Sequence, residues 1–94
     1  MRTEQPPLSR RSILVVDDHP LLRRGLAALI GSAPDLRVCG EAGSCADALD
    51  AVGHTGPDLV ILDLELDGRG GLDLITQFRQ RWPALPVLVL SMHT

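Results

Sequence analysis

The sequence of 94 residues contains no lysine, so its nine basic residues are all arginines, and its formal net charge at pH 7 is −3. Outside the first eleven residues these arginines are scattered along the chain rather than clustered. Because a nucleic-acid-binding surface needs clustered basic side chains, we expect no such surface on this segment. Any contact with DNA would have to come from another domain.

Long apolar runs and cysteines are also scarce. Runs such as residues 13–16 and 87–90 have the length of a strand and are far too short to span a bilayer. Residues 1–11 carry arginines with no apolar stretch after them, so we expect no secretory signal, a cytoplasmic location and no membrane partner. In that setting Cys39 and Cys45 are expected to be reduced thiols, and the dispersed histidines argue against a zinc site.

Residues 1–11 are polar and include two adjacent prolines, which predicts a disordered N-terminal tail before a domain over residues 12–94. Within the domain, short apolar runs alternate with segments of helical periodicity. We expect helices that begin at Pro20 and Ser44 and a third helix that Pro83 closes. The expected strands are residues 13–16, 36–39, 59–62 and 87–90.

The resulting order, β-α-β-α-β-α-β, predicts an α/β fold. Fully apolar strands joined by crossover helices indicate a parallel sheet with helices on both faces. Right-handed crossovers restrict the topology, and the common strand order for such a doubly wound, flavodoxin-like sheet is 2-1-3-4. This order sets the first and third strands side by side.

Acidic residues follow both of these neighbouring strands. Asp17 and Asp18 come directly after the first strand, and Asp63 comes directly after the third. Because the carboxyl ends of adjacent parallel strands meet at one edge of the sheet, we expect these carboxylates to converge. Three negative charges so close together repel each other unless a cation lies between them. Carboxylate oxygens are ligands that suit Mg²⁺, which usually also binds water and a phosphate. The pattern therefore predicts a magnesium-dependent phosphoryl site.

A simpler reading exists for each residue alone, since a single aspartate after a strand is usually a helix cap or a turn residue. That reading is the more common one for Asp18 taken by itself. The cap or turn reading explains the three aspartates together less well. Two of them follow one apolar strand and Asp63 follows another, so all three carboxylates are expected at one edge of the sheet.

Three segments together resemble one family: ILVVDDHPLLRRGL, PDLVILDLELDGRGGLDLI and PVLVLSMHT. They are similar to receiver domains of two-component response regulators, and more narrowly to the NarL/FixJ class, which carries a helix-turn-helix DNA-binding output. The resemblance runs from residue 12 to residue 94. It implies a signalling phosphoacceptor rather than an enzyme, which controls transcription through an output domain that this sequence does not contain.

The resemblance also implies a role for each site residue. Asp63 would accept the phosphoryl group from the phosphohistidine of a sensor histidine kinase. Asp18, Asp63 and the backbone carbonyl of Glu65 would bind Mg²⁺ directly, and Asp17 would act through water. Ser91 matches the hydroxyl position that contacts the phosphoryl group and reports phosphorylation, although a residue that merely ends a strand is an equally good reading of it.

The chain departs from the family pattern in the loop after Asp63. Receivers usually have a proline where this chain has Asp67, and an acidic residue or asparagine followed by glycine where it has Gly70 and Gly71. Asp67 either adds negative charge that loosens the loop or is a solvated turn residue, which we favour. His19 and His93 are expected near the rim of the site as exposed loop residues.

A complete receiver also has a fifth strand, which carries a lysine that pairs with the phosphoryl group, and two further helices. The resemblance therefore predicts a receiver that is incomplete at its C-terminal side. The strand over residues 87–90 would then have an open edge, and such edges pair with other chains, so we expect a homodimer or a swapped oligomer.

Two other functions remain open on the sequence. A magnesium-dependent aspartyl phosphohydrolase is suggested by Asp63 and Glu65 as a D-x-D pair, but such a nucleophile would follow the first strand. A degenerate receiver that acts only as a protein-interaction module is suggested by the missing lysine. Four residues that the resemblance assigns to the site are present and argue against that module, namely Asp17, Asp18, Asp63 and Ser91.

Overall fold

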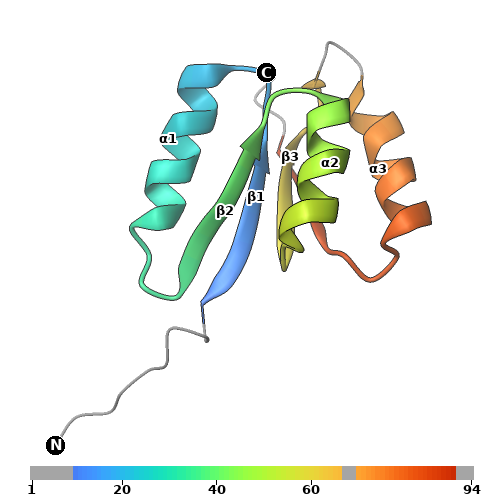
Figure 1. The fold of residues 1–94 in the computed structure, drawn as a ribbon. Helices are drawn as coiled ribbons and strands as arrows, with labels where there is room; N and C mark the ends of the chain where they lie inside the picture. Colours follow the sequence, from blue (N-terminus) through green and yellow to red (C-terminus); the bar gives the residue numbers. More distant parts are fainter. Residues whose placement is uncertain (1–9, 67–69, 91–94) are drawn as a thin grey trace, which may run out of the picture.

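The computed structural model describes residues 10–66 and 70–90, and in this part of the chain strands and helices alternate as predicted (Figure 1). In chain order the elements are β1 (Arg11–Val16), α1 (Pro20–Gly31), β2 (Leu36–Ala42), α2 (Cys45–Thr55), β3 (Leu59–Asp63), α3 (Gly70–Arg81) and β4 (Val87–Leu90). None of the helices in the described ranges is long and apolar enough to cross a membrane.

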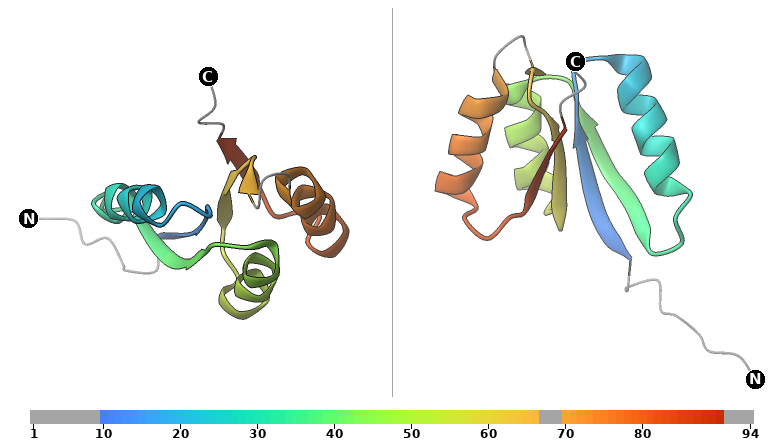
Figure 2. Two further views of the ribbon diagram at one scale, coloured as in Figure 1. Left: turned by 90° about the horizontal axis from the view of Figure 1, so that it is seen from above. Right: turned by 180° about the vertical axis from the view of Figure 1, so that it is seen from behind.

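The four strands form one parallel sheet in the order β2-β1-β3-β4, which confirms the predicted doubly wound fold. β1 and β3 are neighbours, and Val16 lies opposite Leu62 in their register. The two views of Figure 2 show α1 on one face of the sheet and α2 with α3 on the other. The carboxyl ends of β1 and β3 therefore meet at one edge, between the two layers of helices.

The helix ends follow from local sequence signals. Pro20 occupies the first turn of α1, where its missing N–H costs nothing, and His19 is the N-cap residue without a side-chain capping bond. Ser44 caps α2 by accepting a hydrogen bond from the backbone N–H of Asp47 at 3.2 Å. Gly56 ends that helix with φ of 56°, a left-handed conformation that glycine adopts without a steric cost.

Three strands are longer than the sequence predicts, and β3 exceeds its predicted range by one residue, since it includes Asp63. β1 begins at Arg11, the last residue of the predicted tail, while residues 1–9 of that tail lie outside the described residues. β2 runs three residues beyond Cys39 to Ala42, because the second half of β1 pairs with it as far as Val16. The register of this pairing shifts by one residue and skips Cys39. Such irregularities depend on both strands and leave no clear signal in either one.

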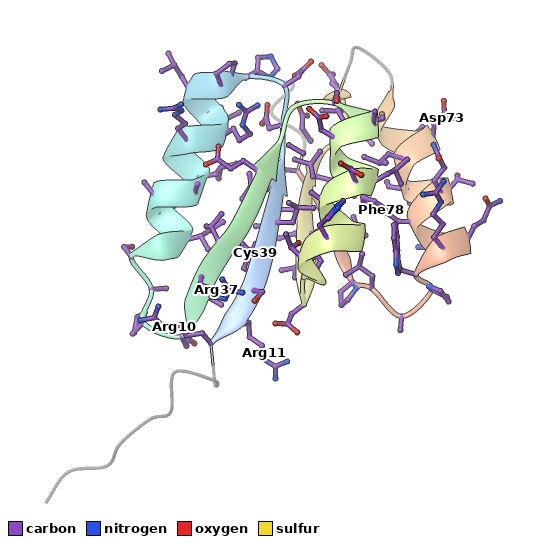
Figure 3. All side chains as sticks on the ribbon, in the orientation of Figure 1. Arg10, Arg11, Arg37, Cys39, Asp73 and Phe78 are labelled. Carbon is purple, nitrogen blue, oxygen red and sulfur yellow. The ribbon has the colours of Figure 1, made fainter. Side chains whose placement is uncertain are left out.

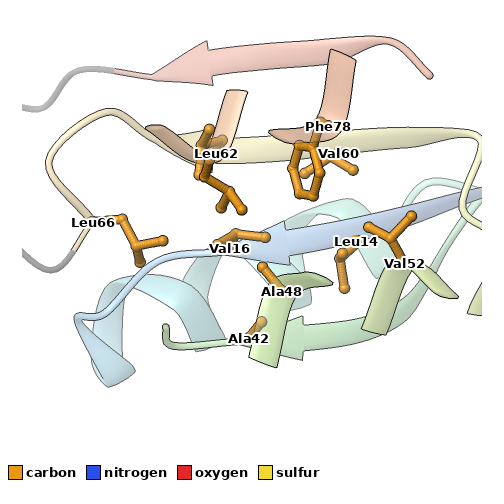
Figure 4. Packing of buried hydrophobic residues seen from close by; sticks show 10 residues of the cluster. Leu14, Val16, Ala42, Ala48, Val52, Val60, Leu62, Leu66 and Phe78 are labelled. Atoms are coloured by element: carbon orange, nitrogen blue, oxygen red, sulfur yellow. The ribbon is translucent and has the colours of Figure 1, made fainter. Parts of the chain in front are cut away.

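The hydrophobic core lies between the sheet and the layer of α2 and α3 (Figure 4). Alternate residues of β1 and β3 point into it, as the period of two in a strand requires. The fully buried cluster consists of Leu14, Val16, Ala42, Ala48, Val52, Val60, Leu62, Leu66, Leu74 and Phe78. This core fixes the backbones of β1 and β3 directly beside the edge at which the aspartates lie.

Candidate functional site

Asp17 and Asp63 are the two buried charged residues among those described, with 3% and 6% of their surface exposed. Asp17 follows β1 directly, and Asp63 is the last residue of β3. Since the two strands are adjacent and parallel, their ends place the carboxylates side by side, as the sequence predicts. Asp18 belongs to the same group and is partly exposed.

The loop between β1 and α1 holds Asp17 in place. Its carboxylate Oδ1 accepts a hydrogen bond from the backbone N–H of His19 at 2.7 Å. Its own backbone N–H donates to the carbonyl of Ala42 at 3.0 Å, and its carbonyl accepts a hydrogen bond from Arg23 Nη1 at 2.8 Å. Arg23 also forms an ion pair with Glu41 at 3.1 Å, so α1 is tied to both β1 and β2 at this point.

His19 contributes more to the site than the sequence suggests. Its side chain is 65% exposed, yet Nδ1 lies 2.9 Å from Asp17 Oδ1, 3.0 Å from Asp18 Oδ1 and 3.7 Å from Asp63 Oδ2. The hydrogen bond with Asp17 and the negative charge of Asp18 raise the pKa of His19 above its ordinary value of 6.5. The only sequence signal for this position is its adjacency to the aspartate pair.

The turn after β3 orients Asp63. The backbone N–H of Glu65 donates to Asp63 Oδ1 at 3.0 Å, so the other oxygen, Oδ2, is the one near His19. Helix α3 approaches this turn closely at Gly71, where a Cβ atom would overlap the backbone of Leu64. A glycine is therefore required at position 71, which gives a physical reason for the glycine that the family pattern has there.

The donor atoms at this edge fit a divalent cation. One ligand atom from each of Asp17, Asp18, His19 and Asp63 can be chosen so that all four lie within 4.8 Å of one another. Three carboxylates at such distances repel each other, and a cation between them removes that repulsion. Carboxylate oxygens are the ligands that Mg²⁺ takes in proteins, usually together with water and a phosphate.

Other charged residues and predicted site residues lie elsewhere. Arg10, Arg11 and Arg37 lie near the amino ends of β1 and β2, at the opposite end of the sheet from the aspartates (Figure 3). Asp67, Ser91 and His93 lie outside the described residues, so their predicted places stay predictions. Glu65 is among the described residues, and the role of its backbone carbonyl as a metal ligand also stays a prediction.

Comparisons with known proteins agree with this geometry. Residues 13–94 match the family model of the response regulator receiver domain. The chain is 42% identical over 82 residues to the DNA-binding transcriptional activator DevR/DosR of Mycobacterium tuberculosis, and 37% identical over 81 residues to the nitrate/nitrite response regulator protein NarL of Escherichia coli K12. These matches cover 87% and 86% of this chain but only 38% of each relative, so the chain spans well under half of their length.

A solved structure gives the same result for the fold. The crystal structure of a two-component response regulator of the LuxR family from Aurantimonas sp. SI85-9A1 superposes with a TM-score of 0.85 at 37% identity. The match covers 92% of this chain and 61% of that one. With the strand order, the acidic edge and the family match in agreement, the chain belongs to the response regulator receiver domain family, and its relatives are response regulators of the NarL and DevR type.

Proposed function

We propose that this chain accepts a phosphoryl group on Asp63 from the phosphohistidine of a sensor histidine kinase in a magnesium-dependent reaction. The observation that supports the proposal is the position of Asp63, a nearly buried carboxylate that faces two further aspartates at the edge of the sheet. Membership of the receiver family supports the same role.

The chemistry needs few groups from the protein. A carboxylate is ionised at neutral pH, so Asp63 needs no general base. One of its oxygens forms a bond to phosphorus while the bond between phosphorus and the kinase imidazole breaks, and the electron pair of that bond stays on the imidazole nitrogen. Glu65, through its backbone N–H on Oδ1, limits the rotation of the Asp63 carboxylate and so orients it for in-line attack.

Asp17, Asp18, Asp63 and the backbone carbonyl of Glu65 would hold Mg²⁺, with Asp17 acting through water. When bound, the ion neutralises charge on the transferring phosphoryl group. Ser91 would contact that group and report its presence. Arg23 keeps the end of β1 in position through its hydrogen bond to the Asp17 carbonyl.

The biological setting extends the proposal. We assign the chain to a cytoplasmic phosphorelay in which a receiver controls a DNA-binding output domain, because DevR/DosR is a DNA-binding transcriptional activator. In this setting the chain is a signalling phosphoacceptor and not an enzyme that turns over substrate. A homodimer or a swapped oligomer is supported by β4, an outer strand of the sheet on which Leu88 and Val89 are exposed.

Phosphorylation by a small acyl-phosphate donor tests the role of Asp63. The chain is incubated with the donor and Mg²⁺, and intact-mass spectrometry is expected to show the addition of one phosphoryl group. Asp63→Asn should abolish the adduct, because an amide is not a nucleophile of this kind. Asp73→Asn is the matched control, since Asp73 is an exposed carboxylate in the first turn of α3 (Figure 3).

The outcomes separate the competing functions. A folded chain that binds Mg²⁺ and forms no adduct would be an interaction module and would contradict the proposal. An adduct that survives Asp63→Asn would place the phosphoacceptor elsewhere. Steady release of phosphate with many turnovers for each chain would instead identify a phosphohydrolase.

A further inference from the structure

The ring of His19 lies against all three carboxylates of the site, although the residue is mostly exposed. We propose that His19 Nδ1 is a ligand of the divalent ion, and that this nitrogen makes the site prefer a first-row transition ion such as Co²⁺ over Mg²⁺. The inference rests on the metal site of the proposed function, and it adds a residue that determines which ion the site selects.

The distances support ligation by the nitrogen. In an octahedral complex with metal–ligand bonds of about 2.1 Å, adjacent ligand atoms lie about 3.0 Å apart and opposite ones about 4.2 Å apart. Nδ1 lies 3.0 Å from Asp18 Oδ1, which matches an adjacent pair of directly bound ligands. Its distance of 3.7 Å from Asp63 Oδ2 falls between the two values. Both distances are compatible with one coordination sphere that contains Nδ1 and the oxygens of Asp18 and Asp63.

The backbone holds His19 in this arrangement. The residue precedes Pro20, and a residue before proline is restricted to extended conformations. His19 adopts such a conformation, with φ of −101° and ψ of 102°. Its N–H is bonded to the same Asp17 oxygen that its ring contacts. The ring is thus directed at the carboxylates before any ion binds, which lowers the entropic cost of ligation.

The nature of the donor atoms sets the preference between ions. Mg²⁺ takes oxygen ligands, whereas imidazole nitrogen suits later first-row ions, whose affinity for such sites rises from Mn²⁺ through Co²⁺ to Ni²⁺. A site with carboxylates alone favours these ions less than one that adds a nitrogen. We therefore expect His19 to give this site a stronger preference for the later first-row ions than a site built only of Asp17, Asp18 and Asp63 would have.

His54 provides a matched control. It is an exposed histidine on α2 whose Nδ1 lies 2.8 Å from the carbonyl oxygen of Asp50 and 3.7 Å from the carboxylate of that residue. It thus has one carboxylate nearby, while His19 has three. An ion that binds a histidine on this chain merely because the ring is exposed would bind His54 as well.

Calorimetric titration of the full chain with Mg²⁺ and with Co²⁺ tests the proposal in the wild type, in His19→Gln and in His54→Gln. We expect His19→Gln to weaken Co²⁺ binding by about tenfold or more, since even outer-shell changes at metal sites cost that much. The Mg²⁺ affinity should fall by a smaller factor in this variant, because Mg²⁺ gains less from a nitrogen ligand than Co²⁺ does. His54→Gln should bind both ions like the wild type, and circular dichroism confirms that each variant is folded.

Proton NMR with Co²⁺ gives a second readout that does not depend on affinity. The unpaired electrons of the ion shift the ring resonances of a coordinating imidazole outside the diamagnetic range. These shifted resonances should be present in the wild type and in His54→Gln and absent in His19→Gln. Their loss in His54→Gln instead would reveal binding at an exposed histidine and would overturn the proposal.

Failure of the inference can be told apart from failure of the proposed function. If Mg²⁺ and Co²⁺ bind and His19→Gln changes neither the affinities nor the spectrum, His19 is no ligand, while the carboxylate site stands. If neither ion binds the folded wild type, the metal site itself is absent, and both proposals are overturned.

Discussion

The two sides of the sheet are held in different ways. On one side, α2 and α3 bury apolar side chains in the core, among them Val52, Leu74 and Phe78. On the other side, α1 has no buried residue, and Leu21 and Leu29 are 88% and 70% exposed. Hydrophobic burial is therefore the main attachment of α2 and α3, whereas α1 depends more on polar contacts.

The polar contacts between α1 and the strands lie near the aspartates. Arg23 bonds the carbonyl of Asp17 and pairs with Glu41, and His19 at the start of the helix contacts the carboxylate of Asp17. The site thus lies between a packed side, which fixes the strand ends, and a polar side, which supplies groups to the carboxylates. A well-packed element holds the residues of a site in fixed positions. A loosely packed element allows its side chains to move when a ligand binds.

The largest expected effect is the loss of a core side chain on the packed side. Phe78 is fully buried and its ring centroid lies 6.0 Å from that of Trp82. Phe78→Ala should lower the free energy of unfolding by about 3–5 kcal/mol, because it removes buried apolar surface and leaves a cavity. Leu29→Ala on α1 should change it by less than about 0.5 kcal/mol. Urea unfolding measures both, and equal losses would contradict the difference between the two sides.

A second prediction compares two glycines. Gly71→Ala should destabilise the chain by about 1–3 kcal/mol, because its Cβ would overlap the backbone of Leu64 and force α3 away from the turn after Asp63. Gly25→Ala on α1 has open space around the new Cβ and should stabilise the chain by about 0.4–1 kcal/mol. Thermal unfolding gives both signs. If Gly71→Ala stabilised the chain, α3 would not approach the backbone of Leu64 as closely as the structure shows.

The third prediction tests the polar attachment of α1. Arg23→Met keeps the length of the side chain but removes its hydrogen bond to the Asp17 carbonyl and its ion pair with Glu41. We expect a loss of about 1–2 kcal/mol in urea unfolding, at the lower end for a hydrogen bond to a charged group because Glu41 is partly exposed. Arg24→Met, at the exposed neighbouring position, is the control. No difference between the two variants would mean that α1 is attached in another way.

The smallest expected effect concerns the titration of His19 without added divalent ions. Its pKa should lie above 6.5 in an NMR titration and should fall toward that value in Asp17→Asn, since the hydrogen bond with Asp17 is the main cause of the shift. Because the folded-state pKa is the higher one, the stabilising contribution of His19 is complete below pH 6.5 and is lost as the pH rises through the folded pKa. A pKa that does not respond to Asp17→Asn would contradict the contact.

Local signals were enough for most of the fold. The apolar runs, Pro20, the Ser44 cap and Pro83 predicted every helix and strand among the described residues. The strand order that is common in doubly wound sheets was the correct one. The meeting of Asp17 and Asp63 followed from that order. The ends of the strands were less predictable: β2 extends to Ala42 because β1 pairs with it, and this depends on a neighbour that local sequence does not show.

The sequence by itself thus determined the succession of elements, their parallel sheet and the edge at which the carboxylates gather, because each depends on periodicity, turn chemistry or chain topology. Only the tertiary structure decided what surrounds those carboxylates. Three contacts join residues from different elements: the approach of Gly71 to Leu64, the bond from Arg23 to the Asp17 carbonyl, and the contact of the His19 ring with Asp63. Such contacts depend on packing distances and side-chain directions, which no local pattern specifies.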